Sequence, residues 1–238
     1  AAGIPYFAST HTPTVKEGQE LAGFSGYDFE YQGYLNGKNA LENGVTKVIM
    51  VEGKLGQGTA AAQSLGFLRA YEEAGKDIGG TAEEVATNKT EGGADLQVVA
   101  WGSGEWWADP AKKLMQDYIS SLGADGFDGA YVQNDEMMDG AIQAIEEAGL
   151  NPGDYWLGSS NGKEKSWAWI EEGKETQDLN QTPTLESDLM FQIVNNYFLD
   201  KTTKSYVNPY TTEIVAGTDM DSLIPYDVNE YFTRLEKG

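Results

Sequence analysis

The sequence predicts an α/β protein in which a parallel sheet is flanked by helices. Short apolar runs alternate along the 238 residues with amphipathic stretches of helical length. Strands that alternate with helices of about 10–15 residues are typical of βαβ units, in which the strands lie parallel. The apolar fraction of 40% is enough to bury a core in a chain of this length. Loops that follow parallel strands gather at one edge of the sheet, where such proteins bind ligands.

The first predicted elements are two strands and a helix. Residues 4–8 (IPYFA) and 45–51 (VTKVIMV) are apolar runs of strand length. A glycine-rich turn follows the second run and leads into a helix at residues 59–74, which Thr59 is expected to cap. Residues 75–93, which are rich in Gly, Thr and Glu, are expected to form a surface insertion.

The middle of the chain repeats this strand–helix pattern. Residues 96–101 (LQVVAW) predict a strand, and the next helix is expected to begin at Asp109 and Pro110, with Asp109 as its cap. Residues 129–132 (GAYV) form the next predicted strand. The remaining predicted elements are a helix capped by Asn134 and Asp135 that ends at Gly149, a strand at residues 154–158, a helix through Trp167 and Trp169, a helix at residues 186–199 and a strand at residues 212–216.

The charge of the chain limits its partners. With 16 Lys and Arg against 38 Asp and Glu, the net charge is −22, which repels nucleic-acid phosphates and anionic membranes. The absence of cysteine excludes disulfides, thiolate metal sites and thiol nucleophiles. No stretch reaches the roughly 18 apolar residues of a spanning helix, and residues 1–5 (AAGIP) do not resemble a signal peptide. We therefore expect no nucleic-acid partner, and either an intracellular protein or a processed or trimmed form.

Residues 158–162 (GSSNG) match the G-x-S-x-G pattern of a hydrolase nucleophile elbow, with Ser160 as the nucleophile. That chemistry needs a histidine base, which follows the serine in the chain order of these enzymes. The single histidine, His11, lies far upstream. We therefore interpret the pattern as a tight strand-to-helix turn and predict no catalytic residue. His11 itself follows the first predicted strand, and a surface role and a ligand contact both stay open for it.

Two other patterns fall short of a nucleotide site or a metal site. Residues 53–59 (GKLGQGT) space two glycines as a phosphate-binding loop does, but the lysine of that motif is missing. The pair Asp219 and Asp221, and Asp125 near Phe127, do not continue into a calcium-loop pattern. We therefore predict no cofactor and no metal ion.

The six tryptophans include a cluster, Trp101, Trp106 and Trp107, at and after one predicted strand. A tryptophan on a loop can stack on the C–H face of a sugar ring and donate a hydrogen bond from its indole N–H. We expect Trp101 in the core, together with one of Trp167 and Trp169. For Trp106, a place in the core and a ligand contact are both open.

One segment carries a resemblance to a known family. It consists of residues 133–137 (QNDEM), followed by residues 140–144 (GAIQA) and 148–149 (AG). The segment resembles the type I periplasmic binding proteins, the ribose-binding-like receptors of sugar ABC transporters. Further matches in the same order, which extend the resemblance over most of the chain, are residues 2–5 (AGIP), 66–67 (GF), 115–116 (MQ) and 181–183 (QTP).

The resemblance implies a protein of two lobes and a chain that is truncated at its N-terminus. Family members begin with a segment that builds most of the first lobe, whereas this chain begins at the last strand of that lobe. The implied organisation is the last strand of lobe I at residues 1–10, lobe II with hinge crossings at residues 11–181, a return to lobe I at residues 182–210, and a C-terminal crossing and tail at residues 211–238. Truncation would also account for the missing signal peptide.

The resemblance also implies ligand contacts, which we carry over one position at a time. Trp106 falls on an aromatic residue that stacks on the ligand, and Asn134 falls on the asparagine of the QNDEM segment. Gln181 falls on a glutamine at the second crossing between the lobes. Asn134 is equally a residue that caps a helix, and that interpretation stays open beside the ligand contact.

Other binding positions depart from the family pattern. Thr10 and His11 stand where family members have an Asp-Arg pair, Ser160 or Asn161 where they have an aspartate, and Ala61 near a family arginine. Neutral side chains bond sugar hydroxyls singly, whereas charged forks bond them in pairs. The departures therefore favour a neutral polar ligand and argue against ribose itself.

With this fold, the resemblance implies an extracytoplasmic solute-binding protein of an ABC importer that binds a sugar or similar polar small molecule by hinged lobe closure, without catalysis. The implied hinges are residues 10–21, 181–183 and 217–219. The implied partners are the ligand and a membrane permease. The location would be the periplasm, or the outer face of a Gram-positive membrane through a lipid anchor, and the acidic surface favours a monomer. Two alternatives share the fold, a sensory receptor and the effector-binding core of a LacI-like regulator.

Overall fold

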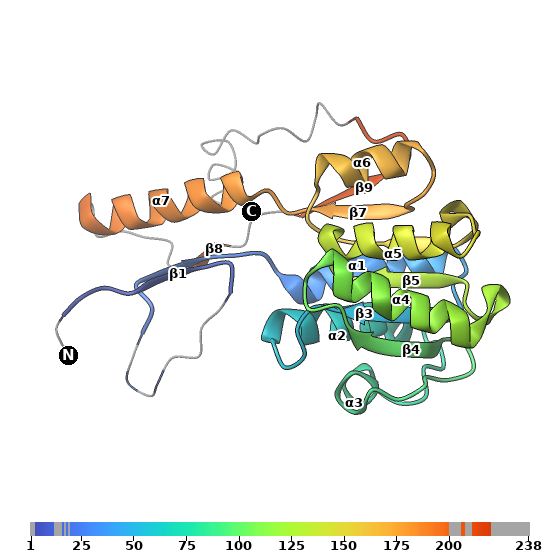
Figure 1. Cartoon of the computed structure of the whole chain (residues 1–238). Helices are drawn as coiled ribbons and strands as arrows, with labels where there is room; N and C mark the ends of the chain where they lie inside the picture. Colours follow the sequence, from blue (N-terminus) through green and yellow to red (C-terminus); the bar gives the residue numbers. More distant parts are fainter. Residues whose placement is uncertain are drawn as a thin grey trace. The chain divides into compact units, whose positions relative to one another are not determined.

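The structure is a computed structural model that describes residues 3–11, 16, 18, 20–199, 206–207 and 211–219 (Figure 1). The chain folds into two compact units. Unit 1 contains the described residues up to Asp28, those between Gln181 and Thr212, and Asp219. Unit 2 contains Phe29–Asn180 and Glu213–Thr218.

Unit 2 is built on a sheet that is mainly parallel. Its strands are β3 (Lys47–Glu52), β4 (Gln97–Ser103), β5 (Gly129–Val132), β6 (Trp156–Gly158), β7 (Gln177–Asn180) and β9 (Thr212–Val215). They lie in the order β4-β3-β5-β6-β7-β9, and every pair from β4 to β7 is parallel. The predicted fold class, an α/β protein with a parallel sheet flanked by helices, is therefore confirmed.

Helices cover both faces of this sheet (Figure 1). Successive residues of β3 point to opposite faces, so that Ile49 and Val51 pack with α4 and α5, whereas Val48 and Met50 pack with the other helical layer. Because both sides of β3 are buried, its sequence is a continuous apolar run. The helices are α1 (Phe29–Glu42), α2 (Gly58–Glu73) and α3 (Ala82–Asn88) in one layer, α4 (Ala108–Leu122) and α5 (Asp135–Glu147) in the other, and α6 (Glu164–Glu171) before β7.

Unit 1 contains a short parallel sheet in the order β1-β2-β8, made of β1 (Phe7–Ser9), β2 (Gly23–Ser25) and β8 (Tyr206–Val207). Helix α7 (Pro183–Leu199) packs on β1 and β2. A β-carbon at Gly23 would lie 2.4 Å from Cγ2 of Ile193, so glycine allows the close approach of the helix to the strand. The Phe7 ring meets the Tyr197 ring edge-on at a centroid distance of 5.3 Å.

The predicted strand at residues 129–132 coincides with β5, and of the two predicted caps of the next helix Asn134 is confirmed, whereas Asp135 is the first residue of the helix. Oδ1 of Asn134 accepts a hydrogen bond from the backbone N–H of Met137 at 3.0 Å. Gly149 adopts a φ of 74°, the left-handed conformation expected just after the end of α5. Local signals were therefore sufficient around α5.

Two other predicted helix caps are wrong. α2 begins at Gly58, so Thr59 lies inside its first turn, and α4 begins at Ala108, so Asp109 lies inside the first turn of that helix. Each preceding loop already closes a turn, through a backbone hydrogen bond from Gln57 to Lys54 in one case and from Trp107 to Gly104 in the other. The helical path therefore starts earlier than the side-chain signals indicate.

The sequence pattern did not reveal α1, because glycine and polar residues stand beside Leu35 and Ala40 on its buried face and interrupt the apolar periodicity. A β-carbon at Gly33 would lie 2.0 Å from the carbonyl oxygen of Gln63, and one at Gly37 would lie 2.2 Å from that of Phe67. The backbones of α1 and α2 therefore approach each other closely, and no apolar periodicity is needed. β7 escaped notice for a related reason, since its residues Gln177–Asn180 (QDLN) are mostly polar and yet all buried.

The prediction that residues 75–93 form a surface insertion is wrong in part. Thr81 and Glu84 form a reciprocal capping box that begins α3. Ile78, Ala82 and Val85 are buried in the core beside α2. The segment is polar on its outer side only.

The unit boundaries differ from the implied lobe boundaries over residues 11–28 and, by one residue, at Gln181, which belongs to unit 1. Residues 11–28 were expected with lobe II, whereas the described residues of this stretch belong to unit 1. The physical reason is that β2 pairs with β1 and so extends the same sheet. At the other crossings the chain changes unit after Asn180, after Thr212 and after Thr218.

Candidate ligand-binding site

The loops that follow the strands of unit 2 meet at the carboxyl edge of its sheet. Trp106 follows β4, Asn134 follows β5, and Ser160 and Asn161 follow β6. Nδ2 of Asn134 lies 3.4 Å from the carbonyl oxygen of Trp106, and the backbone N–H of Asp135 donates to the carbonyl oxygen of Ser160 at 3.1 Å. Four of the predicted site residues therefore lie in one continuous row of loops.

Trp106 is positioned by its own backbone and by the loop after β3. Glu105 and Trp106 have φ angles of 53° and 67°, a region that residues other than glycine rarely adopt. The indole N–H donates to Oε1 of Gln57. The half-buried ring lies against Gly53, where a β-carbon would be 2.1 Å from it. Strained backbone that holds a large side chain in one place is typical of functional sites.

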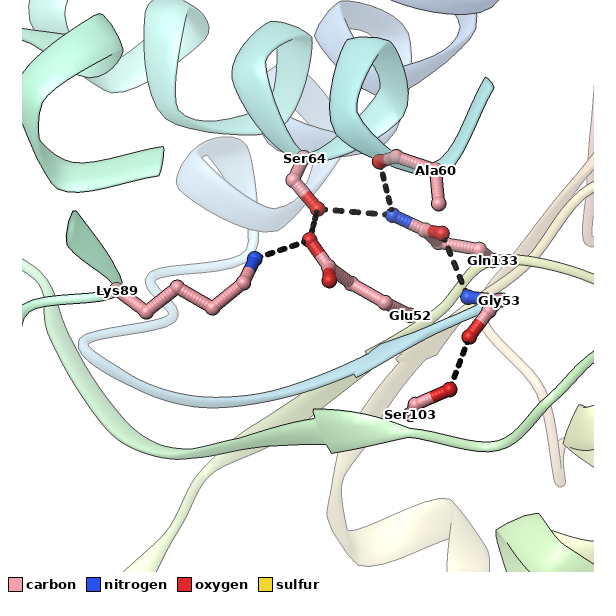
Figure 2. A network of polar contacts seen from close by, with 7 residues as sticks. All are labelled: Glu52, Gly53, Ala60, Ser64, Lys89, Ser103 and Gln133. Carbon is pink, nitrogen blue, oxygen red and sulfur yellow. Dashed lines mark hydrogen bonds and ion pairs between the residues drawn. The ribbon is translucent and has the colours of Figure 1, made fainter. Parts of the chain in front are cut away.

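A buried polar network supports the glycine loop beneath Trp106 (Figure 2). Oε1 of Gln133 accepts a hydrogen bond from the backbone N–H of Gly53 at 2.9 Å. Nε2 of Gln133 donates to the carbonyl oxygen of Ala60 and to Oγ of Ser64, both at 2.9 Å. Ser64 donates in turn to Glu52 at 2.6 Å. In the sequence, Gln133 stands out only as the first residue of the QNDEM segment. The hydrogen bond by which it supports Gly53 is visible only in the structure.

The predicted insertion contributes the cation of this network. Nζ of Lys89, the residue after α3, lies 2.6 Å from Oε1 of the buried Glu52 (Figure 2) and 4.0 Å from the ring centroid of Trp101. Trp101 is half-buried and packs against the core. One of Trp167 and Trp169 was predicted to lie in the core. Trp169 does so: it is 6% exposed and packs in the core around α4 and α5.

Asn134 caps α5, so one of its two open interpretations is confirmed. Its Oδ1 atom bonds Met137, and its amide nitrogen makes a long contact with Trp106. The amide nitrogen carries two N–H groups, and the contact with Trp106 uses one of them. A ligand contact by Asn134 therefore stays a prediction that is compatible with its capping role.

Ser160 and Asn161 form the loop after β6. Ser160 is buried, and its Oγ atom has no hydrogen-bond partner within the part of the chain that the structure describes. Asn161 has a φ of 140° and donates its backbone N–H to Leu179 at 2.9 Å. Nearby, burial raises the pKa of Tyr131, so its phenol stays protonated at neutral pH. The loop thus offers neutral donors and acceptors.

Three predicted contacts belong to unit 1 and are not tested by this geometry. Thr10, which follows β1 with a φ of 65°, bonds Ser25 through its backbone and the buried Glu186 through its hydroxyl. His11 is exposed, and Gln181 is the first residue of unit 1 after β7.

A cavity of unit 2 lies at the opposite edge of the sheet. This cavity of about 340 Å³ is lined in part by Asp128 and Trp156, which stand just before β5 and at the start of β6. Its polar groups are already engaged, because Asp128 accepts hydrogen bonds from Thr46 and Lys47, and Trp156 donates to Asn39. We therefore place the candidate site at the carboxyl edge.

Among the described residues, no group of three or more His, Asp or Glu side chains is arranged to hold a metal ion. Asp125 and Asp219, which were weighed as calcium-loop residues, lie within the described part, whereas Asp221 lies outside it. In the same described stretches, no helix combines the length and the apolar character that crossing a membrane requires.

Comparison with known proteins agrees with this architecture. A sequence profile described as "Periplasmic binding protein domain" matches residues 1–202. The chain belongs to this family. The resemblance found in the QNDEM segment is therefore confirmed.

The periplasmic binding proteins that the chain resembles include two curated relatives. It is 26% identical over 157 residues to the galactofuranose-binding protein YtfQ of Escherichia coli (strain K12), which covers 65% of this chain and 43% of that protein. It is 44% identical over 55 residues to the xylitol-binding protein of Mycolicibacterium smegmatis (strain ATCC 700084 / mc(2)155), covering 23% of this chain and 16% of that protein. The matched part thus spans less than half the length of these relatives.

A solved structure of a galactofuranose binding protein resembles the fold, with a TM-score of 0.76 and 23% identity. The match covers 98% of this chain and 70% of that one. It supports the fold assigned to this periplasmic binding protein domain.

Proposed function

We propose that the chain is the ligand-binding part of an extracytoplasmic solute-binding protein of an ABC importer, with a sugar or a related polyol as ligand. The observation that carries the proposal is the match of residues 1–202 to the periplasmic binding protein family. Two relatives of the chain are named as binding proteins for galactofuranose and for xylitol. The proposed activity is binding; the single histidine of the sequence, His11, lies far upstream of Ser160, whereas the base of such enzymes follows the serine.

The chemistry of the carboxyl edge suits a neutral, hydroxyl-rich ligand. The fixed indole ring of Trp106 offers a flat face for the C–H side of a sugar ring. The second amide N–H of Asn134 and the side chains of Ser160 and Asn161 are neutral groups that bond hydroxyls one at a time. Thr10, His11 and Gln181 of unit 1 are proposed contacts on the strength of the resemblance alone.

Binding by hinge closure fits the connectivity of the chain, which changes unit after Asp28, Asn180, Thr212 and Thr218. We place the hinges at these crossings, in part at the implied residues 181–183 and 217–219. The proposed partner is a membrane permease, and the proposed location is the periplasm or, with a lipid anchor, the outer face of a Gram-positive membrane. The net charge of −22 favours a soluble monomer.

The test is thermal melting and calorimetric titration of the protein against furanoses, pyranoses, polyols, nucleosides and amino acids. A ligand at 100 times its Kd adds about 2.7 kcal/mol to the free energy of unfolding, which is a readable shift. Trp106→Ala is expected to raise the Kd about thirtyfold, the loss of a contact worth about 2 kcal/mol.

Trp107→Ala is the matched control, because Trp107 is the next residue in the chain and its side chain is 66% exposed. It should leave the Kd unchanged. A shift with an amino acid or a nucleoside, and none with a sugar or polyol, would contradict the proposed ligand class. Equal losses of affinity in both variants would contradict the role of Trp106.

A further inference from the structure

Three carboxyl groups are buried together at the carboxyl edge of the β5–β6–β7 part of the sheet. Asp135 is the first residue of α5, Glu175 stands just before β7, and Asp178 lies within β7. Their exposures are 2%, 3% and 0%. The candidate site as described above uses none of these side chains.

A single hydroxyl bridges two of these carboxyls. Oγ of Ser159, the residue after β6, lies 3.0 Å from Oδ1 of Asp135 and 2.5 Å from Oε1 of Glu175. A serine hydroxyl has one proton and can donate to only one of the two oxygens. The other carboxyl forms a hydrogen bond with Ser159 only if it carries a proton and donates it. The geometry therefore favours at least one protonated carboxyl.

No side-chain cation neutralises the cluster within the described residues. Lys163 donates only its backbone N–H, at 2.7 Å, to Oδ2 of Asp135, while its ammonium group pairs with Glu136 on the surface. The backbone N–H of Leu179 bonds Oδ1 of Asp178 at 2.7 Å. Burial of several ionised carboxylates without a cation is strongly unfavourable, whereas a protonated carboxyl is itself a donor.

Two further oxygens fit this account. Oδ2 of Asp178 and Oε2 of Glu175 are buried and receive no hydrogen bond from a donor in the described part of the chain. Burial, reinforced by the charge of Asp135, raises the pKa of Glu175 and of Asp178 well above the ordinary carboxyl range. Burial also raises the pKa of Asp135 to about 6, against the opposing hydrogen bonds from Lys163 and Ser159. The charge of Lys163 opposes the rise in the pKa of Asp135, and Ser166 is a neutral neighbour of Glu175.

The cluster is joined directly to the loop of the candidate site. Ser159 immediately precedes Ser160 and Asn161, and the backbone N–H of Asp135 holds the carbonyl oxygen of Ser160. Asn161 is bridged to Asn180, two residues beyond Asp178. A change in the cluster therefore acts directly on the Ser160–Asn161 loop.

We propose that Asp135 and Glu175 share a proton across Ser159, that Asp178 beside them stays protonated, and that this proton-sharing cluster holds the Ser160–Asn161 loop in its binding geometry. The three acids and Ser159 are positioning residues: they act on the ligand through the loop. The effect on affinity rests on the proposed function, whereas the shared protons do not. Because the folded protein holds more protons than the unfolded chain, stability from the cluster is present at acid pH and declines as pH rises. For Asp135 the decline ends near pH 6, and for the other two acids it continues above that.

The first test is infrared spectroscopy of the whole protein at about pH 7, where ordinary carboxyls are ionised. A buried carboxylic acid band is expected in the wild type and is expected to weaken in Glu175→Gln and in Asp178→Asn. The amides mimic the protonated acids and keep the hydrogen bonds. Absence of the band in the wild type overturns the proposal, and this result needs no variant to fold.

The second test compares stability against pH. Melting between about pH 5 and pH 9 is expected to show a smaller loss of stability at high pH in Glu175→Gln and Asp178→Asn than in the wild type. Glu172→Gln is the matched control, since Glu172 is exposed on the same connection and lies outside the cluster. Equal slopes in all four proteins, or a rise in Tm of the wild type with calcium that Asp178→Asn abolishes, overturn the shared protons.

The third test measures how the affinity for a ligand, which depends on the Ser160–Asn161 loop, changes with pH. With a sugar identified by titration, the Kd of the wild type is expected to rise with pH, by at most about tenfold per pH unit for one linked proton, and the amide variants are expected to flatten that rise. A parallel rise in wild type and variants overturns the positioning role. If no sugar binds at any pH, the proposed function fails, while the infrared band and the stability slopes still decide on the cluster.

Discussion

The indole ring of Trp106 lies against Gly53, in contact so close that a β-carbon on Gly53 would be 2.1 Å from the ring. The two residues come from loops after neighbouring strands, and Trp106 is held there by a left-handed backbone and by its bond to Gln57. The aromatic face proposed for the ligand therefore depends on the absence of a side chain at position 53.

Gly53→Ala is accordingly expected to push the indole ring out of place. The overpacking should cost about 1–3 kcal/mol of stability and weaken sugar binding more strongly than the melting shift alone accounts for. Chemical denaturation and titration calorimetry measure the two effects. Gly58→Ala, in the same loop region and with open space around its β-carbon, should change neither quantity appreciably. Normal affinity in Gly53→Ala would show that the ring position is not needed.

Gln133→Ala is expected to release the glycine loop from beneath. The substitution leaves the buried Gly53 N–H without this partner, at about 1–3 kcal/mol, and removes one hydrogen bond each from the Ala60 carbonyl and from the Ser64 hydroxyl, which still donates to Glu52. Hydrogen exchange should rise at the amide of Gly53 before it rises in β5. Gln143→Ala on α5, whose side chain bonds only the partly buried Asp139 and Lys112, serves as the control and should cost much less. Equal costs in the two variants would refute the supporting role of Gln133.

Thr81→Ala is expected to remove the capping box of α3 and to cost about 1 kcal/mol. Hydrogen bonds from Thr81 lower the pKa of Glu84, so the stability that this bond provides is present above the ordinary Glu pKa and is lost as pH falls through the lowered value. The difference in stability between wild type and Thr81→Ala should therefore shrink in acid, as denaturation at a series of pH values would show. Thr87→Ala, exposed within the same helix, lacks that pH dependence; the same dependence in both variants would contradict the cap.

The sequence predicted the parts of the fold that depend on nearby residues. The apolar run of β3, the strand at β5 and the Asn134 cap of α5 are all readable from a few adjacent letters. α1 was missed because glycine and polar residues interrupt the apolar periodicity of its buried face, and β7 was missed because its buried residues are mostly polar. In both cases the partner that explains the residue lies far away along the chain.

The candidate site divides in the same way. Trp106 and Asn134 were named from the resemblance, and their loops do meet in the structure. Gln133, Glu52 and Lys89 were not named as a group, because nothing in the local pattern links residue 52 to residue 89. The sheet register and the turn at the end of α3 bring them together.

By itself, the sequence determined the α/β class, the family and the large negative charge, since periodicity, a motif and composition are properties of the chain read in order. Only the tertiary structure decided that Gly53 must remain bare beneath Trp106 and that Ser159 bridges Asp135 and Glu175. The physical reason is that folding removes water and brings distant residues into contact. The protonation of a carboxyl group and the space beside a glycine depend on those neighbours, which the order of residues in the chain does not show.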